Sequence, residues 1–353
     1  MAETPLNTPA ALGFRMPAEW HPHHSTWLTW PKDPETWPDR VPQVEQIYLE
    51  MIAALTPHEV VDLLVDDEQT EQLVRSRCNA AVSSRIRFHH IQTVDSWIRD
   101  YGPNFLLGPN GQCAFNDWTF NAWGNKYPEL KKDDRVPQRL EPFLELKRFS
   151  PGIVLEGGSI EVNGAGCVLT TEQCLLNKNR NPELSRAEIE QYLKNYLGVT
   201  NVLWLGEGIV GDDTDGHIDD IARFVAADVI VCAVEDDPAD ANYEILQDNL
   251  ARLKSMTGAT GQRFEIVTLP MPGNVGGSNT TQRDLERLPA SYANFYIANN
   301  VVLAPVFGHA NDERAVDTLQ RLFPTRRIVP INCEPLVWGM GTIHCVTQQQ
   351  PQI

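Results

Sequence analysis

The feature that most constrains the fold of this chain is a series of short, apolar, β-rich runs separated by segments with helical periodicity. Runs of this length predict strands, and the periodic segments between several of them predict helical crossovers. Together they indicate an α/β fold. The runs cover residues 25–30, 59–65, 85–91, 201–205, 229–234, 264–269, 295–304 and 327–331.

One helix is defined at both ends by its sequence. Ser185 stands at the N-cap with Glu188 three residues later, which is the pattern of a capping box. Apolar side chains then follow at helical spacing up to Leu197, and Gly198 comes just past the end. The sequence therefore predicts a helix before Gly198 that leads directly into the strand at 201–205.

Other strands are joined by tight turns at residues 109–111, 163–166 and 299–300, which are rich in Asn and Gly. The fold is thus expected to mix hairpins with helical crossovers, whereas a doubly wound parallel sheet would not need the hairpins. Residues 126–138 form the most polar interruption. We interpret them as a surface excursion within a single domain, because β-rich sequence resumes soon after.

The charge of the chain limits its partners. It carries 47 acidic and 29 basic side chains, a net charge of -18, which repels the phosphates of nucleic acids. The ordinary explanation is solubility, and the more specific one is a cationic substrate. No stretch approaches eighteen consecutive apolar residues, and the first residues lack the pattern of a signal peptide. We therefore predict a cytoplasmic protein with no membrane partner.

Three patterns suggest cofactors, and none is convincing. The seven cysteines are scattered without a CxxC pair, and the histidines at 21, 23 and 24 have no obvious carboxylate or thiolate partner, so no metal is expected. Residues 206–211 match the G-x-G-x-x-G dinucleotide pattern. Asp212 and Asp213 follow where a helix N-terminus should receive pyrophosphate, so no nucleotide is expected. The same acidic stretch lacks two of the ligands that an EF-hand requires.

Four short segments, each acidic or glycine-rich, stand at expected strand ends or loops. Such positions are typical of residues that a rigid scaffold holds toward a pocket. The segments are 95–103, 155–159, 212–219 and 339–347.

These segments supply the groups that attack on a guanidinium requires. Two carboxylates must hold the planar N–H donors, a thiolate must reach the central carbon, and an acid/base must serve the departing ammonia. Asp100 and Asp219 are candidates for the first role and Cys345 for the second. His217 is the candidate proton shuttle, and Glu156 is a carboxylate that could orient its imidazole. Taken singly, each residue type more often has a structural role.

The four segments, together with residues 16–20, 177–181, 291–296 and 347–351, closely resemble the agmatine deiminases and the related bacterial peptidylarginine deiminases. The resemblance runs in the same order from about Met16 to the C-terminus. It implies a five-bladed α/β propeller of ββαβ units around a closed polar pocket, which our own strand assignment did not reveal. It also implies one catalytic domain over residues 1–353, with 1–15 as an N-terminal tail, and is compatible with a homo-oligomer.

In that family the cysteine of the terminal G-x-G-x-x-H-C motif is the nucleophile, and it falls on Cys345. The D-G-H-x-D motif falls on His217 and Asp219, the aspartate of W-x-R-D on Asp100, and the glutamate of E-G-G on Glu156. The resemblance and the chemical requirement therefore select the same five residues.

Two positions depart from the family pattern. Glu is common where this chain has Asp213, and three glycines are common where it has Gly339, Met340 and Gly341. We expect Asp213 to pair with the far ammonium of the substrate and Trp97 to pack along its aliphatic tail. The alternatives are a loop cap for the aspartate and simple core packing for the tryptophan.

The resemblance implies hydrolysis of agmatine to N-carbamoylputrescine and ammonia through a covalent thiouronium on Cys345, a step of putrescine and polyamine synthesis. The alternatives are a deiminase of free or peptidyl arginine, an amidinotransferase, a metal-dependent ureohydrolase and a non-catalytic guanidine binder. A substrate with an α-carboxylate would require a placed arginine, for which the sequence offers Arg15, Arg99, Arg180 and Arg223.

Overall fold

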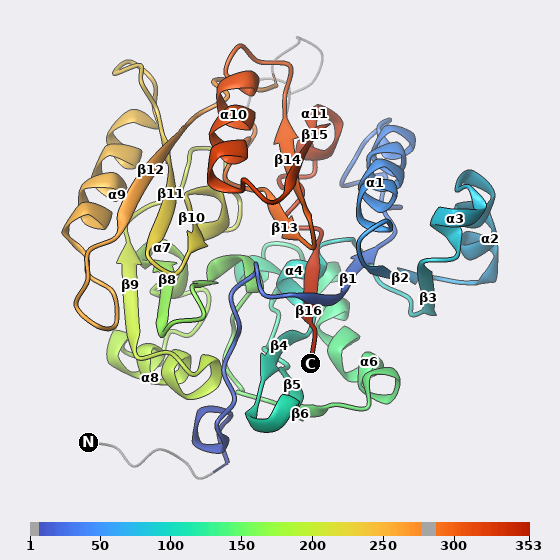
Figure 1. Ribbon diagram of the computed structural model, residues 1–353, viewed down its shortest axis with the longest axis horizontal. Helices are drawn as coiled ribbons and strands as arrows, with labels where there is room; N and C mark the ends of the chain where they lie inside the picture. Colours follow the sequence, from blue (N-terminus) through green and yellow to red (C-terminus); the bar gives the residue numbers. More distant parts are fainter. Residues whose placement is uncertain (1–6, 277–286) are drawn as a thin grey trace.

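The computed structural model describes residues 7–276 and 287–353, and their strands form five separate sheets. Figure 1 shows these sheets arranged in a ring, with most of the long helices on its outside. Each sheet contains an antiparallel pair followed, through a helical segment, by a parallel strand. The predicted α/β propeller of five ββαβ units is therefore confirmed, and its repeats are visible in the strand order.

Four of the sheets are continuous in sequence. The first of these has β4 (Asn104–Leu107), β5 (Cys113–Asn116) and β6 (Lys147–Phe149), with α5 (Ala122–Asn125), η3 (Pro128–Arg135) and α6 (Val136–Leu144) before β6. The next has β7 (Glu161–Val162), β8 (Cys167–Thr171) and β9 (Asn201–Leu205), with α7 (Glu172–Leu175) and α8 (Arg186–Leu197). The third has β10 (Ala222–Ala226), β11 (Val229–Val234) and β12 (Glu265–Pro270), with α9 (Tyr243–Ser255). The fourth has β13 (Tyr296–Ala298), β14 (Val301–Val306) and β15 (Arg327–Asn332), with α10 (Asp312–Leu322).

The remaining sheet joins the two ends of the chain and so closes the ring. Its order is β16 (Gln348–Pro351), β1 (His23–Thr29), β2 (Val60–Val65) and β3 (Ile86–His90). The last strand pairs antiparallel with β1, and Thr26 lies opposite Gln349. Helices α1 (Val41–Leu55), α2 (Glu68–Arg77) and α3 (Ala80–Ser83) connect its parallel strands.

Short helices link the sheets. The helices α4 (Ile98–Tyr101), η4 (Gly157–Ser159) and η5 (Ile218–Asp220) form a chain of contacts, whereas α11 (Glu334–Val337) packs against α1. The remaining short helices are η1 (Ala10–Leu12) and η2 (Pro109–Gly111). No helix within residues 7–276 and 287–353 is long and apolar enough to cross a membrane.

The local sequence signals that we used are confirmed. Each of the eight apolar runs contains a strand, and the run at 295–304 is the hairpin β13–β14, which turns at Asn300 with φ of 59°. In α8, Ser185 and Glu188 form the capping box and Gly198 ends the helix with φ of 68°. Strand ranges for β4 to β8, β10 and β16 were not predicted, because these strands have only two to five residues.

The N-terminal tail is shorter than predicted. Thr8 and Phe14 are buried, and the N–H of Arg15 donates to the carbonyl of Leu107 at 2.9 Å. Residues 8–15 are thus packed against the body of the protein, while residues 1–6 lie outside the described part of the chain. Treatment of the whole chain as one domain stays a prediction.

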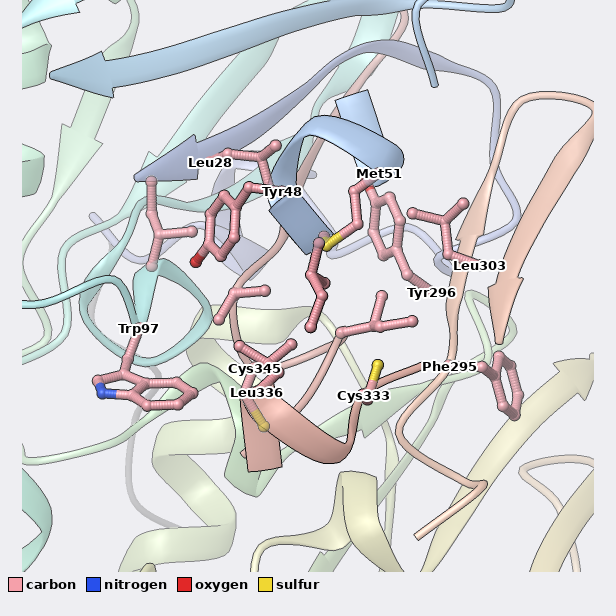
Figure 2. Packing of buried hydrophobic residues seen from close by; sticks show 14 of the residues in the cluster. Leu28, Tyr48, Met51, Trp97, Phe295, Tyr296, Leu303, Cys333, Leu336 and Cys345 are labelled. Carbon is pink, nitrogen blue, oxygen red and sulfur yellow. The ribbon is translucent and has the colours of Figure 1, made fainter. Parts of the chain in front are cut away.

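The largest apolar core reaches the centre of the ring. In Figure 2, Tyr48 and Met51 of α1 pack among Leu28 and side chains of the β13–β14 hairpin, and Trp97 and Cys345 lie nearby. Cys345 is 7 % exposed and belongs to this same cluster. Its position is therefore fixed by dense packing on one side.

Candidate active site

Three of the four predicted segments converge on one glycine. A β-carbon added to Gly158 would lie 2.6 Å from Nδ1 of His217, 2.8 Å from Oδ1 of Asp100 and 3.2 Å from Oδ2 of Asp219. Any side chain at this position would collide with all three groups. The second glycine of the E-G-G motif is therefore required by close approach of functional side chains, not by backbone conformation.

The Asp100 carboxylate is held by neutral donors. Its Oδ1 accepts the backbone N–H of Gly158 at 3.0 Å, and its Oδ2 accepts the indole N–H of Trp123 at 2.9 Å. Burial, and then the negative charges of Asp219 and Glu156, raise the pKa of Asp100 well above its usual value. Ionisation of this carboxyl group is therefore disfavoured.

The Asp219 carboxylate is held by a cation. Its Oδ2 lies 2.7 Å from Nδ1 of His344, whose Nε2 lies 2.8 Å from Oε2 of Glu19. Glu19 in turn pairs with Arg223 at 2.9 Å and Arg99 at 3.4 Å. Burial alone would raise the pKa of Asp219, but the hydrogen bond and charge of His344 keep it below its usual value.

Both carboxylates that flank His344 therefore favour the ionised form. Burial also opposes ionisation of Glu19, yet Arg223 and His344 hold its pKa well below the usual value. Each ring nitrogen of His344 therefore faces a carboxylate oxygen, Nδ1 that of Asp219 and Nε2 that of Glu19. The second oxygen of Asp219, Oδ1, is buried and has no hydrogen-bond partner within the protein.

Cys345 lies beside the Asp219 carboxylate. Its Sγ is 3.7 Å from Oδ2 of Asp219 and 3.2 Å from Nδ2 of Asn294. The backbone N–H of Arg99 donates to the carbonyl of Cys345 at 3.2 Å, which ties this segment to α4. Burial, followed by the charges of Asp219, Asp220 and Asp100, raises the pKa of the Cys345 thiol well above its usual value.

His217 lies beside Gly158, close to both Asp100 and Asp219. Its Nδ1 is 3.8 Å from Oδ1 of Asp100, and its Nε2 is buried without a hydrogen-bond partner. Burial, opposed by Asp219, lowers its pKa to about 3, so the imidazole is neutral at physiological pH. Asp212 holds the loop before it, because its Oδ2 accepts the backbone N–H of His217 at 3.0 Å.

Glu156 does not make the contact that the sequence suggested. Its Oε1 accepts from Nε of Arg180 at 2.7 Å, whereas its Oε2 has no hydrogen-bond partner. It lies close to His217, with ligand atoms of the two residues within 4.8 Å of each other, but it makes no hydrogen bond to the imidazole. Arg180 takes one oxygen of the carboxylate, and the role predicted for Glu156, orientation of the His217 imidazole, stays a prediction.

A cavity of about 530 Å³ leads to Cys345 and Asp100. Its charged side chains are mostly acidic, with only Lys126 positive among the described lining residues. The acidic members are Asp33, Glu35, Asp95, Asp100, Glu129 and Asp213, and the aromatic members are Trp97, Trp123, Tyr127 and Trp338. Residues 126–130 all line this cavity, and 126–129 are also exposed, so the polar segment that we interpreted as a surface excursion lies at the surface and forms part of the cavity wall.

The two residues expected to meet the substrate tail both line the cavity. The indole N–H of Trp97 donates to Oδ2 of Asp95 at 2.8 Å, and its ring lies 5.4 Å from that of Trp37. Asp213 accepts from the hydroxyl of Tyr127 and lies 3.2 Å from the ammonium of Lys126. The loop cap that we considered for Asp213 is instead supplied by Asp212, whose Oδ1 accepts the N–H of Thr214 at 2.7 Å.

Sequence reasoning did not find several residues of the site. Asn294 contacts Cys345, His344 contacts Asp219, Glu19 contacts His344, and Arg180, considered only as a partner for a substrate carboxylate, contacts Glu156. Each lies in one of the segments that carry the family resemblance, so the signal was present. Trp123 lies outside those segments and had no sequence signal.

Comparisons with known proteins agree over almost the full length. A sequence model of the Porphyromonas-type peptidyl-arginine deiminases matches residues 15–351. A putative agmatine deiminase of Legionella pneumophila is 40 % identical over 353 residues, covering 98 % of each chain. The solved structure of the Enterococcus faecalis agmatine deiminase is similar with a TM-score of 0.92 and 36 % identity, and the match covers 100 % of this chain and 99 % of that one. A cysteine-to-serine variant of the C. jejuni agmatine deiminase with substrate bound is similar with a TM-score of 0.84 and 31 % identity, covering 96 % of both chains.

Proposed function

The chain belongs to the Porphyromonas-type peptidyl-arginine deiminase family, and we propose that it hydrolyses the guanidinium group of agmatine to N-carbamoylputrescine and ammonia. The observation that carries this proposal is the charge of the cavity, which has six carboxylates and one lysine among its described lining residues and ends at a buried cysteine. Agmatine has a cation at each end, so it complements such a cavity.

The described lining of this cavity favours agmatine over substrates with a carboxylate. No arginine is among the described residues that line this cavity. Three of the arginines that the sequence offered are committed elsewhere, since Arg99 and Arg223 pair with Glu19 and Arg180 pairs with Glu156. Free arginine would bring its α-carboxylate into an acidic cavity, and repulsion would weaken its binding.

The guanidinium is held between Asp100 and Asp219. Oδ1 of Asp219 is buried without a partner, so it is available to accept an N–H of the substrate. The substrate cation also offsets the repulsion between the two carboxylates, and Asp100 then loses its proton. Two charge-assisted contacts fix the plane of the guanidinium above the thiol.

The bound cation also activates the nucleophile. The carboxylates that disfavour the Cys345 thiolate are neutralised when a guanidinium lies between them, so the thiol proton is lost more readily. Nδ2 of Asn294 donates to the sulfur and stabilises the negative charge. Sγ then attacks the guanidinium carbon and forms a tetrahedral adduct.

His217 moves the protons. Because its imidazole is neutral, it can accept the proton that Cys345 loses and deliver it to the nitrogen that leaves as ammonia. The carbon is then bound to Sγ as a thiouronium. Water attacks this carbon, His217 takes a proton from the water, and the C–S bond breaks to give the carbamoyl product and the free thiol.

Trp97 and Asp213 recognise the rest of the substrate. The ring of Trp97 is an apolar part of the cavity wall. Asp213 also lines the cavity, where it contacts Tyr127 and Lys126. Asp213 is one methylene shorter than glutamate, so the ammonium of agmatine must approach it more closely or through a water. We keep the cytoplasmic location and a homo-oligomeric assembly as predictions from the sequence.

The test is ammonia release by the purified, metal-stripped protein with agmatine, free arginine and a blocked arginine peptide. We expect agmatine to be strongly preferred and Cys345→Ser to reduce turnover by at least about 10⁴-fold, as for other nucleophile replacements. Equal rates on arginine would overturn the substrate assignment. Full turnover by Cys345→Ser would overturn the covalent mechanism, and activity that requires added manganese would indicate a metal-dependent ureohydrolase instead.

A further inference from the structure

Three potential metal ligands lie close together, and they include the proposed proton shuttle, His217, but not the nucleophile. Glu156, Cys174 and His217 each offer one ligand atom, and these atoms lie within 4.8 Å of one another. All three residues are buried, with exposed fractions of 0 %, 0 % and 1 %. We infer that they form a binding site for a thiophilic divalent cation such as Zn²⁺.

Two of the three residues have an unused ligand atom. Oε2 of Glu156 and Nε2 of His217 are both buried and have no hydrogen-bond partner, although most buried polar atoms in proteins have one. The other oxygen of Glu156 is occupied by Arg180 at 2.7 Å. Arg180 therefore fixes the carboxylate while it leaves Oε2 available for a cation.

The ligand set matches zinc chemistry. One sulfur, one nitrogen and one oxygen are the donors that Zn²⁺ accepts in proteins, and three protein ligands leave a fourth position for water. Bonds of about 2.0–2.3 Å imply distances between ligand atoms of about 3.3–3.8 Å. Any two of the three atoms would need to approach each other by at most about 1–1.5 Å, which side-chain rotations can supply.

The surrounding charges are mixed, with an excess of acid. Arg180 opposes a cation, whereas Asp212 and Asp215 are near enough to Cys174 to affect its ionisation, and Asp215 pairs with Arg180 at 2.6 Å. Binding replaces the Cys174 thiol proton with the metal and releases that proton to solvent. Cys174 is held in α7, where its backbone N–H donates to Oγ1 of Thr171 at 3.2 Å.

Occupation of this site would stop turnover without contact to Cys345. If His217 carries protons as proposed above, a metal on its ring prevents that transfer, so the inhibition rests on the proposed function. The binding of the metal does not depend on that function. Inhibition by zinc would then depend on Cys174, a residue that takes no part in the proposed reaction.

Binding is tested in a background that lacks the nucleophile. Cd²⁺ is titrated into Cys345→Ser, and its ultraviolet sulfur-to-metal absorption is compared with that of Cys345→Ser/Cys174→Ser and Cys345→Ser/Cys232→Ser. The last variant is the matched control, because Cys232 is equally buried but lies on β11. We expect saturation at one equivalent, at least about tenfold weaker binding without Cys174 and no change without Cys232. Equal binding by all three variants would overturn the site, whatever the enzyme's substrate.

Inhibition is tested with Cys345 intact. The zinc concentration that halves agmatine turnover is measured for wild type, Cys174→Ser and Cys174→Ala, each relative to its own rate without zinc. An increase of at least about tenfold in both Cys174 variants supports the site. An unchanged value means that zinc acts through Cys345. Should neither variant fold, anomalous diffraction from Cys345→Ser crystals soaked in zinc gives the answer, since a metal peak away from Cys174 overturns the proposal.

Discussion

Asp100 and Asp219 are the same residue type, are both buried and both lie beside Gly158, yet the protein shifts their pKa values in opposite directions. Asp100 receives only neutral N–H donors, from Gly158 and Trp123, and its pKa is raised. Asp219 contacts the ring of His344, and its pKa is lowered. The difference between the two lies in the charges and donors that the fold places beside them.

This asymmetry suits a site that binds a cation. A pair of ionised carboxylates would repel each other in the empty enzyme, and a pair of protonated ones would attract no guanidinium. With one carboxyl group that favours ionisation and one that disfavours it, the site keeps a negative charge at Asp219 and gains a second negative charge at Asp100 when the substrate binds. Substrate binding should therefore release a proton.

The strongest test of the asymmetry replaces each carboxylate in turn. Asp219→Asn removes one of the two carboxylates that flank the buried His344 ring, so we expect a loss of about 3–5 kcal/mol in the free energy of unfolding. Asp100→Asn replaces a group that is already neutral and should cost clearly less. We expect kcat/KM for agmatine to fall by at least about 10²-fold in both, and further in Asp219→Asn. Ammonia release and urea unfolding measure the two effects, and equal losses of stability would refute the asymmetry.

A second test weakens only the Asp219 side. His344→Gln retains one N–H donor toward Asp219 or Glu19 but removes the positive charge, so we expect kcat/KM to fall by about 10–100-fold. The acidic limb of the pH–rate profile should move to higher pH, because Asp219 becomes easier to protonate. His89→Gln is the matched control, since His89 also pairs with a buried carboxylate, Asp62 at 2.7 Å, but does not line the cavity. An unmoved profile in His344→Gln would show that His344 does not control Asp219.

The third test uses pH. Because the pKa of Asp100 is raised on folding, the native state holds its proton more tightly, and this contribution to stability is lost as pH rises from about 4 through the raised pKa. Asp219 acts in the opposite sense, since its contribution is lost as pH falls below about 4. Between pH 5 and 8, wild type should therefore lose up to about 1.4 kcal/mol per pH unit more than Asp100→Asn. Parallel urea-unfolding curves for the two proteins would contradict this.

The smallest expected effect comes from Lys126, which lines the cavity but contacts neither Asp100 nor Asp219. Lys126 lies within 3.2 Å of Asp213 and 2.9 Å of Asp215, and about a third of its side chain is exposed. Lys126→Met removes a competing cation, so we expect KM for agmatine to fall by no more than about fivefold with kcat unchanged. A rise in KM would show that Lys126 helps to bind substrate. The effect should shrink as salt is added.

Much of the framework was predictable because its signals are local. The capping box at Ser185, the glycine after α8 and the Asn299-Asn300 turn act over a few residues, and all three have the predicted structure. The five repeats were not evident, since β7 has two residues and β16 is Gln348–Pro351, a sequence with little preference for strands. Strand β16 forms because β1 offers it an edge more than 300 residues away in sequence.

The sequence by itself determined which groups are available for chemistry: a thiol, a histidine and several carboxylates in segments that resemble one family. Only the tertiary structure decided their state. It paired Glu156 with Arg180 instead of His217, turned residues 126–130 into a cavity wall, and placed His344 beside Asp219 but not beside Asp100. Such outcomes depend on burial and on charges brought together from distant parts of the chain, and the energies of buried charges are set by those neighbours, not by residue type.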